Sequence, residues 1–285
     1  YEAYMELYVV NASLGVDAYG LLMDPTSPTD FTLQIPTNEE IRVMQISDTQ
    51  IIYPYDLRYE GILSASEIER WGGENAKYEH CFVYMEKSFE ILEKSGKLPH
   101  LIVLAGDNIY GQFDDDGTML DALIVKMDKL CEDYGIYWTF VFGNHDKESD
   151  IGVEEILRKY SNSAYCLYAY RNVSGDSNMS VAIKQDNEYK QIVYMFDTHN
   201  TGSASGTNQK GNRVDEYATL LAGIYDSQIE WFQSVADVYK NVPSLVYMHI
   251  AFEEYARTFA GHGYGVTYDE ITTSSVDAVV SKSNT

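Results

Sequence analysis

The chain has 285 residues, 45% of them hydrophobic, so it is long enough to bury a sizeable core and too apolar to be intrinsically disordered. Asp and Glu outnumber Lys and Arg by 44 to 20, which gives a net charge of −24 at neutral pH. Such a surface repels polyanions, so we expect no nucleic acid as the main partner. The longest apolar run is far too short to cross a bilayer, and no transmembrane segment is expected.

Residues 1–40 form an apolar, Tyr-rich opening and then a stretch rich in Pro, Ser, Thr and Asp at 24–30. The second part is typical of a loop or linker. The opening is either the tail of a preceding domain or an edge strand of this one. We therefore place a separate N-terminal segment at 1–40 and the main domain at 41–285.

Strands and helices are predicted to alternate from residue 41 onwards. Short apolar runs predict strands at 41–47, 101–105, 136–142, 180–183, 191–196 and 242–248. Apolar residues at three- and four-residue spacing predict helices at 74–94, 117–134, 153–160 and 227–239. This alternation indicates an α/β architecture.

Four of the predicted strands end in a side chain that can bind a metal ion. These side chains are Asp48, Asp107, Asn144 and His249. An aspartate after a strand also serves as a turn residue or helix cap, and it is the combination of four that favours a metal site. Carboxylate, amide and imidazole ligands suit Mn, Fe or Zn, and a carboxylate between two such ions can bridge them.

The same residues stand in sequence blocks that resemble those of calcineurin-like metallophosphoesterases. The blocks are Asp48-Thr49-Gln50, Gly106-Asp107-Asn108, Gly143-Asn144-His145-Asp146 and His249. The resemblance runs from about residue 41 to the end, and the run 249–255 is similar to the purple acid phosphatase-like and secreted phosphoesterase subgroup. It implies two mixed β-sheets packed as a sandwich and flanked by helices.

The resemblance also implies how the chain would hold two divalent metal ions, of Mn, Fe or Zn. Asp48 and Gln50 would hold the first ion, and Asp107 would bridge. Asn144 and His249 would hold the second ion. In the family the first block commonly carries His where Gln50 stands here, and a Gln carbonyl is a weaker ligand.

Two residues beside these ligands receive catalytic roles from the resemblance. His145 would contact the phosphate and protonate the leaving group, oriented by Asp146. Asn108, His199 and His262 are candidates for the substrate side of the site. The family closes its site with a Gly-His-x-His block, of which only Gly-His at 261–262 is present here, so we expect the missing part to follow residue 285.

The predicted function is hydrolysis of a small phosphate mono- or diester by a hydroxide that the dinuclear centre activates. One alternative is a non-catalytic binding module on a degenerate phosphoesterase fold, which the incomplete Gly-His-x-His block and Gln50 favour. Another is a nuclease, which the net charge of −24 opposes. The chain starts without Met, and the resembling subgroup is often exported, so we expect a secreted or envelope protein.

Overall fold

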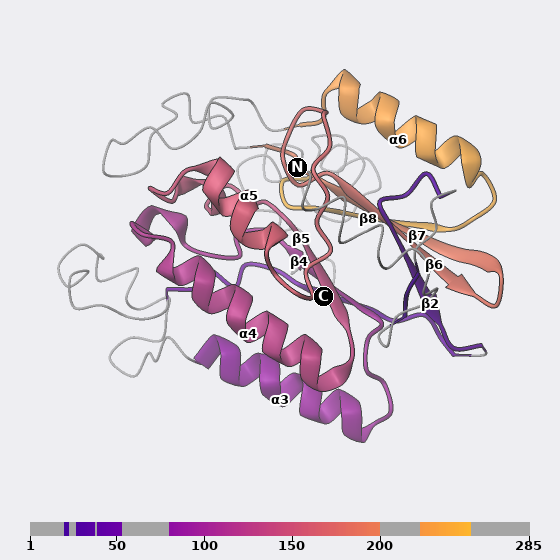
Figure 1. Ribbon diagram of the computed structural model, residues 1–285, viewed down its shortest axis with the longest axis horizontal. Helices are drawn as coiled ribbons and strands as arrows, with labels where there is room; N and C mark the ends of the chain where they lie inside the picture. The colour runs from indigo at the N-terminus through magenta and orange to yellow at the C-terminus, as the bar shows by residue number, and fades with distance from the viewer. Residues whose placement is uncertain (1–19, 23–26, 38, 53–79, 200–222, 252–285) are drawn as a thin grey trace, which may run out of the picture.

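The protein is an α/β sandwich of four layers, shown as a computed structural model in Figure 1. The structure describes residues 20–22, 27–37, 39–52, 80–199 and 223–251. Two β-sheets face each other in the middle, with helices α3 and α4 along the outer side of one sheet and α6 over the other. None of the helices in these residues is long and apolar enough to cross a membrane.

The larger sheet, sheet A, has five described strands in the spatial order β1-β2-β6-β7-β8. Its strands are β1 (Leu21–Leu22), β2 (Phe31–Ile35), β6 (Met179–Gln185), β7 (Glu188–Phe196) and β8 (Ser244–Met248). The sheet is mixed: β2 pairs in parallel with β6, β6 pairs antiparallel with β7, and β7 pairs in parallel with β8. Its strands alternate between two cores, so one face lies against the other sheet and the opposite face against α6.

The smaller sheet, sheet B, has three described strands, all parallel, in the order β3-β4-β5. Its strands are β3 (Val43–Ile46), β4 (Leu101–Ala105) and β5 (Tyr137–Val141). The helices that connect and follow them are α3 (His80–Lys94), the short helix η3 (Gly111–Phe113), α4 (Thr118–Tyr134), the short helix η4 (Asp146–Glu148) and α5 (Val153–Ser161). Every residue of β4 and β5 is buried, because sheet A covers one face and helices cover the other. This two-sided burial explains why both strands are almost wholly apolar.

The helix that covers the other face of sheet A is α6 (Asp226–Val238). Its buried residues Trp231 and Val235 pack with Ile192, Tyr194 and Phe196 of β7. The inward residues of the same strand, such as Val193 and Met195, belong to the core between the sheets. Near its carboxyl end β7 thus has apolar residues on both faces, and this end of the strand is buried.

The predicted fold class is confirmed, and each predicted strand and helix has a counterpart within a few residues. The part of the predicted helix before residue 80 lies outside the described residues. One further strand, β2, was not predicted: it lies inside sheet A, and Phe31, Leu33 and Ile35 are buried in the central core. The apolar, Tyr-rich opening before residue 20 lies outside the described residues, so both alternatives for it stay open.

Candidate metal centre

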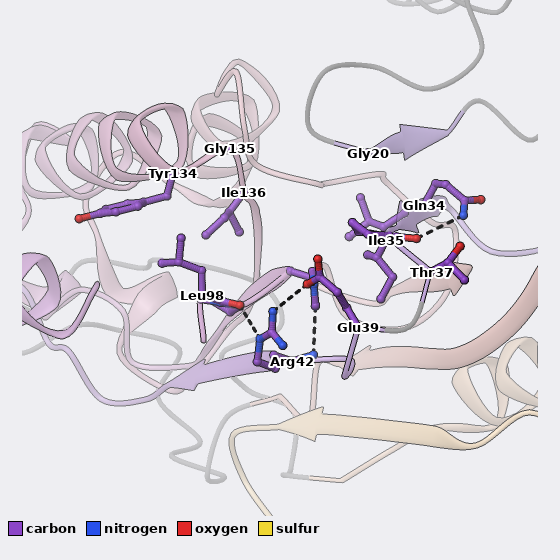
Figure 2. Close-up of a pocket in the computed structure, with 14 residues that line it drawn as sticks. Gly20, Gln34, Ile35, Thr37, Glu39, Arg42, Leu98, Tyr134, Gly135 and Ile136 are labelled. Carbon is purple, nitrogen blue, oxygen red and sulfur yellow. Dashed lines mark hydrogen bonds and ion pairs between the residues drawn. The ribbon is translucent and has the colours of Figure 1, made fainter. Parts of the chain in front are cut away.

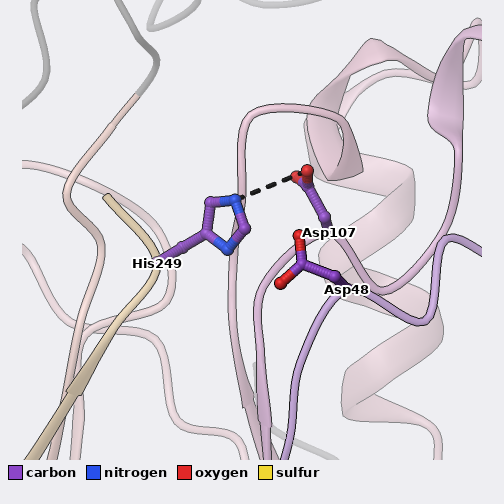
Figure 3. A group of neighbouring side chains, drawn as sticks. All are labelled: Asp48, Asp107 and His249. Atoms are coloured by element: carbon purple, nitrogen blue, oxygen red, sulfur yellow. Dashed lines mark ion pairs between the residues drawn. The ribbon is translucent and has the colours of Figure 1, made fainter. Parts of the chain in front are cut away.

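The carboxyl ends of β3, β4 and β8 meet at one edge of the sandwich, and an ionisable side chain follows each. Asp48 and Asp107 follow parallel neighbours, and backbone pairing continues beyond the strands, since Asp48 N–H donates to the Gly106 carbonyl at 3.0 Å. His249 comes from sheet A. Figure 3 shows the three side chains pointing toward one another, and one ligand atom from each lies within 4.8 Å of the others.

The backbone at this edge adopts a conformation that is rare outside glycine. The φ angles of Asp48, Gln50 and Asp107 are +54°, +40° and +50°. Non-glycine residues in this left-handed region cost free energy and are concentrated at functional sites. The strain indicates that the surrounding hydrogen bonds hold these side chains in a required position.

Asp107 is the central residue of the group and is only 4% exposed. Its Oδ2 atom lies 3.4 Å from Nε2 of His249 and 3.3 Å from the side-chain nitrogen of Gln50. Its Oδ1 atom accepts the backbone N–H of His145 at 2.9 Å. Burial acts to raise the pKa of Asp107, but the hydrogen bond and charge of His249 and the charge of His145 lower it overall. The group is therefore an ionised carboxylate with neighbours on both oxygens.

His249 is held so that one particular nitrogen faces the carboxylates. Its Nδ1 atom lies 3.0 Å from the carbonyl oxygen of Ala105, which can only accept, so Nδ1 carries the proton. Nε2 then faces Asp107. A backbone carbonyl on the far nitrogen is the usual support for a metal-binding histidine. Burial acts to lower the pKa of His249, but the hydrogen bond and charge of Asp107 raise it to about 9 without a metal ion.

Two glycines leave the space that these ligands need. A Cβ atom on Gly106 would lie 2.5 Å from three atoms of His249, and φ of Gly106 is +91°. A Cβ atom on Gly143 would lie 2.2 Å from Oδ1 of Asp107. The two glycines therefore allow the loops after β4 and β5 to approach the ligands closely.

The loop after β5 brings Asn144 and His145 next to Asp107. Asn144 is half-buried and precedes the backbone amide that binds Asp107, and its role as a ligand stays a prediction. The imidazole of His145 lies against the ring of Tyr110, with 4.6 Å between centroids, and its Nδ1 is 2.7 Å from Oε2 of Glu148. Burial acts to lower the pKa of His145, but the Glu148 hydrogen bond and the charge of Asp107 raise it overall.

Asp146 has a different position from the one we expected. We predicted that it orients His145, but the carboxylate that hydrogen-bonds this imidazole is Glu148. Asp146 is 1% exposed and accepts the backbone N–H groups of Asn108, Ile109 and Gly143 at 2.8, 3.2 and 2.7 Å. It therefore fastens the loop after β5 to the loop after β4.

The remaining predicted residues lie in several places. Gln50 lies beside Asp107, as described above. Asn108, a candidate for the substrate side, is instead buried, and its side-chain nitrogen donates to the Val141 carbonyl at 3.0 Å. His199 is also buried, 3.2 Å from the Ser174 hydroxyl, where a position lining the substrate cleft was predicted. His262 lies outside the described residues.

A pocket lies at the opposite ends of the sheet B strands (Figure 2). It is lined by Gly20, by residues 33–37 at and after the end of β2, and by residues that precede β3, β4 and β5. Its charged groups bind one another: Arg42 pairs with Glu39 at 3.0 Å and donates to the Leu98 carbonyl at 2.7 Å. His100 lies 3.2 Å from the same Glu39 carboxylate. Parallel sheets carry their chemistry at the carboxyl ends of the strands, so this pocket is separate from the candidate metal centre.

The residues present fit a metal site. Two carboxylates and an imidazole with a fixed tautomer converge, and the amide of Gln50 lies beside them. This donor set suits divalent ions of intermediate hardness such as Mn, Fe or Zn. In the absence of an ion, the proton on His249 offsets the negative charge that an ion would neutralise.

Sequence reasoning missed Glu148. The signal was available, because residues three apart in a tight helical turn lie above one another: His145 directly precedes the short helix η4, and Glu148 is its last residue. Tyr110, which packs on the imidazole, carried no such signal, since it lies on another loop.

Comparison with known proteins shows relatives that share part of this chain. The "Probable inactive purple acid phosphatase 14" of Arabidopsis thaliana is 23% identical over 87% of this chain, which spans 64% of that protein. The "Probable inactive purple acid phosphatase 28" of the same organism is 24% identical over 63% of this chain, which spans 48% of that protein. The profile of the calcineurin-like phosphoesterases matches residues 41–281, and the chain therefore belongs to the calcineurin-like phosphoesterase family.

Proposed function

We propose that this chain hydrolyses phosphate mono- or diesters at a dinuclear metal centre built around Asp48, Asp107 and His249. The observation that carries the proposal is the convergence of these side chains within 4.8 Å, at the carboxyl ends of strands from both sheets. The anchoring of His145 on Asp107 supports it further, because this puts an acid next to the ligands. The family match supports hydrolysis of a phosphate ester as the reaction.

In this proposal the ligands divide between two ions. Asp48 and Gln50 would hold one ion, Asn144 and His249 would hold the other, and Asp107 would contribute to both. Ions of Mn, Fe or Zn held there would supply positive charge for the phosphoryl oxygens and lower the pKa of a bound water. Asp107 suits the shared role because both of its oxygens face ligand-bearing loops.

His145 acts as the general acid. Its Nδ1 faces Glu148 at 2.7 Å, so Nε2 is the atom that donates a proton to the leaving-group oxygen. The charge of Glu148 and of Asp107 favours the imidazolium, which is the form that an acid needs at the start of the reaction. Tyr110 packs on the ring and restricts its rotation.

The substrate class is a small phosphate ester, since the charge of −24 opposes binding of nucleic acid. A secreted or envelope location stays a prediction. A second candidate function is binding of phosphate esters without turnover. It is supported by the names of the two relatives, which call them inactive, and by Gln50 in the first block.

The test combines metal content with hydrolysis. Metal per chain is measured by elemental mass spectrometry after loading with Mn, Fe or Zn, and turnover is measured with p-nitrophenyl phosphate and its bis ester. We expect about two ions per chain and a loss of turnover of more than about tenfold in Asp107→Asn. Asp133→Asn, on the exposed side of α4, is the control. Two bound ions without hydrolysis of either ester would support the binding role, and an active Asp107→Asn would exclude the shared ligand.

A further inference from the structure

The two halves of the proposed metal centre come from different sheets. Asp48 and Asp107 follow strands of sheet B, whereas His249 follows β8 of sheet A. Hydrogen-bonded ladders fix spacing within a sheet but not between sheets. Metal sites accept ligand positions only within about 0.2 Å, so the ends of the two sheets need a fixed separation.

A buried ion pair joins the two sheets beside this centre. Lys147 lies in the short helix η4, within the loop after β5, and is 7% exposed. Its Nζ atom is 2.9 Å from Oδ2 of Asp197 and 3.4 Å from Oδ2 of Asp176. Asp197 follows β7, which pairs in parallel with β8. The carboxylate that binds Lys147 thus stands on the strand next to the one that carries His249.

Asp197 is a rigid partner for this lysine. Its Oδ2 atom also accepts the N–H groups of Asp176 at 2.8 Å and Ser177 at 3.4 Å, and its Oδ1 accepts the N–H of His199 at 2.9 Å. Burial acts to raise the pKa of Asp197, but the charges of Lys147 and His199 and its hydrogen bonds lower it overall, so it stays ionised. The lysine therefore meets a carboxylate that is already fixed to sheet A.

Four successive side chains of the loop, at positions 146–149, bind four different parts of the molecule. Asp146 binds the loop after β4, Glu148 binds His145, and the Ser149 hydroxyl donates to the carbonyl of Asp114 at 2.6 Å. Lys147 is the member of this set that reaches sheet A. The loop that carries the predicted ligand Asn144 and acid His145 is thereby connected to both sheets.

A buried ion pair seldom adds net stability, because removing both charges from water costs about as much as their attraction returns. We propose that the Lys147–Asp197 pair, here called the sheet clamp, is a positioning pair that fixes His249 relative to the sheet B ligands. That two metal ions bind here rests on the proposed function. The position of His249 relative to the sheet B ligands can be tested in the metal-free protein.

The test replaces both charged side chains with uncharged ones of similar size, in the double variant Lys147→Met/Asp197→Asn. The control is Arg171→Met/Asp30→Asn, which removes another largely buried ion pair, the one that links residue 171 to the start of β2. The first readout is the ¹⁵N spectrum of histidine-labelled, metal-free protein. It reports the Nδ1–H bond from His249 to Ala105, and the signal is assigned with His249→Gln.

We expect the clamp variant to fold and to lose the protected Nδ1–H signal, while the control keeps it. In a titration with Mn²⁺ the clamp variant should bind the ion at His249 at least about tenfold more weakly, with the other ion unaffected. If the double variant does not fold, Lys147→Arg, which keeps the charge and changes the length of the link, should give the same two changes. An unchanged His249 signal in the clamp variant would overturn the proposal. A wild-type protein that has the protected signal but hydrolyses no ester would refute the proposed function and leave the clamp intact.

Discussion

Replacing Gly106 with alanine should remove metal binding at a small cost in folding stability. Gly106 separates the end of β4 from Asp107, its φ is +91°, and an added Cβ would lie 2.5 Å from Cβ, Cγ and Nδ1 of His249. Contacts of this kind are ordinarily 3.4 Å or longer, so either His249 or the loop must move by about 1 Å. Metal sites accept shifts of about 0.2 Å, so His249 should cease to be a ligand.

Gly106→Ala has two separate effects, one on the free energy of folding and one on the affinity for metal. An L-residue at positive φ costs about 1–2 kcal/mol of folding free energy, whatever its neighbours. Loss of His249 as a ligand should weaken metal binding by about 100-fold or more, which corresponds to about 2.8 kcal/mol. The second term is specific to the contact with His249, because it does not depend on the backbone angle.

Gly96→Ala is the matched control. Gly96 also has positive φ, +65°, and nothing lies within 4 Å of a Cβ atom built there. Urea unfolding of the metal-free proteins should show a similar loss for both variants, and calorimetric titration with Mn²⁺ or Zn²⁺ should show weakened binding only for Gly106→Ala. Wild-type metal affinity in Gly106→Ala, or an equal loss of affinity in Gly96→Ala, would refute the reasoning.

Two further changes test the loop after β5. Glu148→Gln removes the charge that holds His145 as an acid, so turnover should fall by about tenfold or more while metal content stays the same, as measured by steady-state kinetics and elemental analysis. Asp146→Ala leaves the buried N–H groups of Asn108, Ile109 and Gly143 without their acceptor, so the free energy of unfolding in urea should fall by about 3 kcal/mol or more.

Each of these variants has an outcome that contradicts its premise. Glu155→Gln is the control for Glu148→Gln, because Glu155 also pairs with a residue three positions away but lies on the surface of α5. Equal turnover in both variants and wild type would show that His145 does not depend on Glu148. Wild-type stability of Asp146→Ala would show that water or another group replaces the carboxylate at those amides.

The strands and helices could be predicted because their patterns are local. Leu101–Ala105 is wholly apolar since both faces are covered, and α4 has apolar residues at helical spacing and ends at Gly135, whose backbone is left-handed. β2 was not predicted, for the opposite reason. Its partner β6 lies about 150 residues further along the chain, and nothing in Phe31–Ile35 itself specifies such a neighbour.

The candidate site also contains some residues that could be predicted from the sequence and others that could not. Asp48 and Asp107 could be predicted as neighbours because parallel strands of one sheet bring their carboxyl ends to one edge, whereas His249, which follows a strand of the other sheet, was placed with them by the family resemblance. The structure brings these three side chains together. The Lys147–Asp197 pair could not be predicted, since its members are 50 residues apart and each resembles an ordinary surface charge. Burial and pairing of charges between two sheets are properties of the packed molecule.

The strained backbone of the site gives a last prediction, about why Asp48 is an aspartate. Asp48, Gln50 and Asp107 all have positive φ, and such strain costs about 1 kcal/mol or more at each position. Asp48 is exposed, so its side chain adds little packing to the folded state. If folding alone determined this residue, glycine would serve at least as well, because it adopts this backbone without strain.

Asp48→Gly should therefore leave the metal-free protein as stable as wild type or more stable by up to about 1 kcal/mol, since it removes both the strain and the repulsion from Asp107. The same change should abolish the rise in melting temperature that Mn²⁺ or Zn²⁺ produces in the wild type, because a ligand is lost. Thermal unfolding with and without added metal measures both effects on one sample. A variant that is destabilised without metal, yet still stabilised by metal as wild type is, would mean that Asp48 serves the fold and that the metal lies elsewhere.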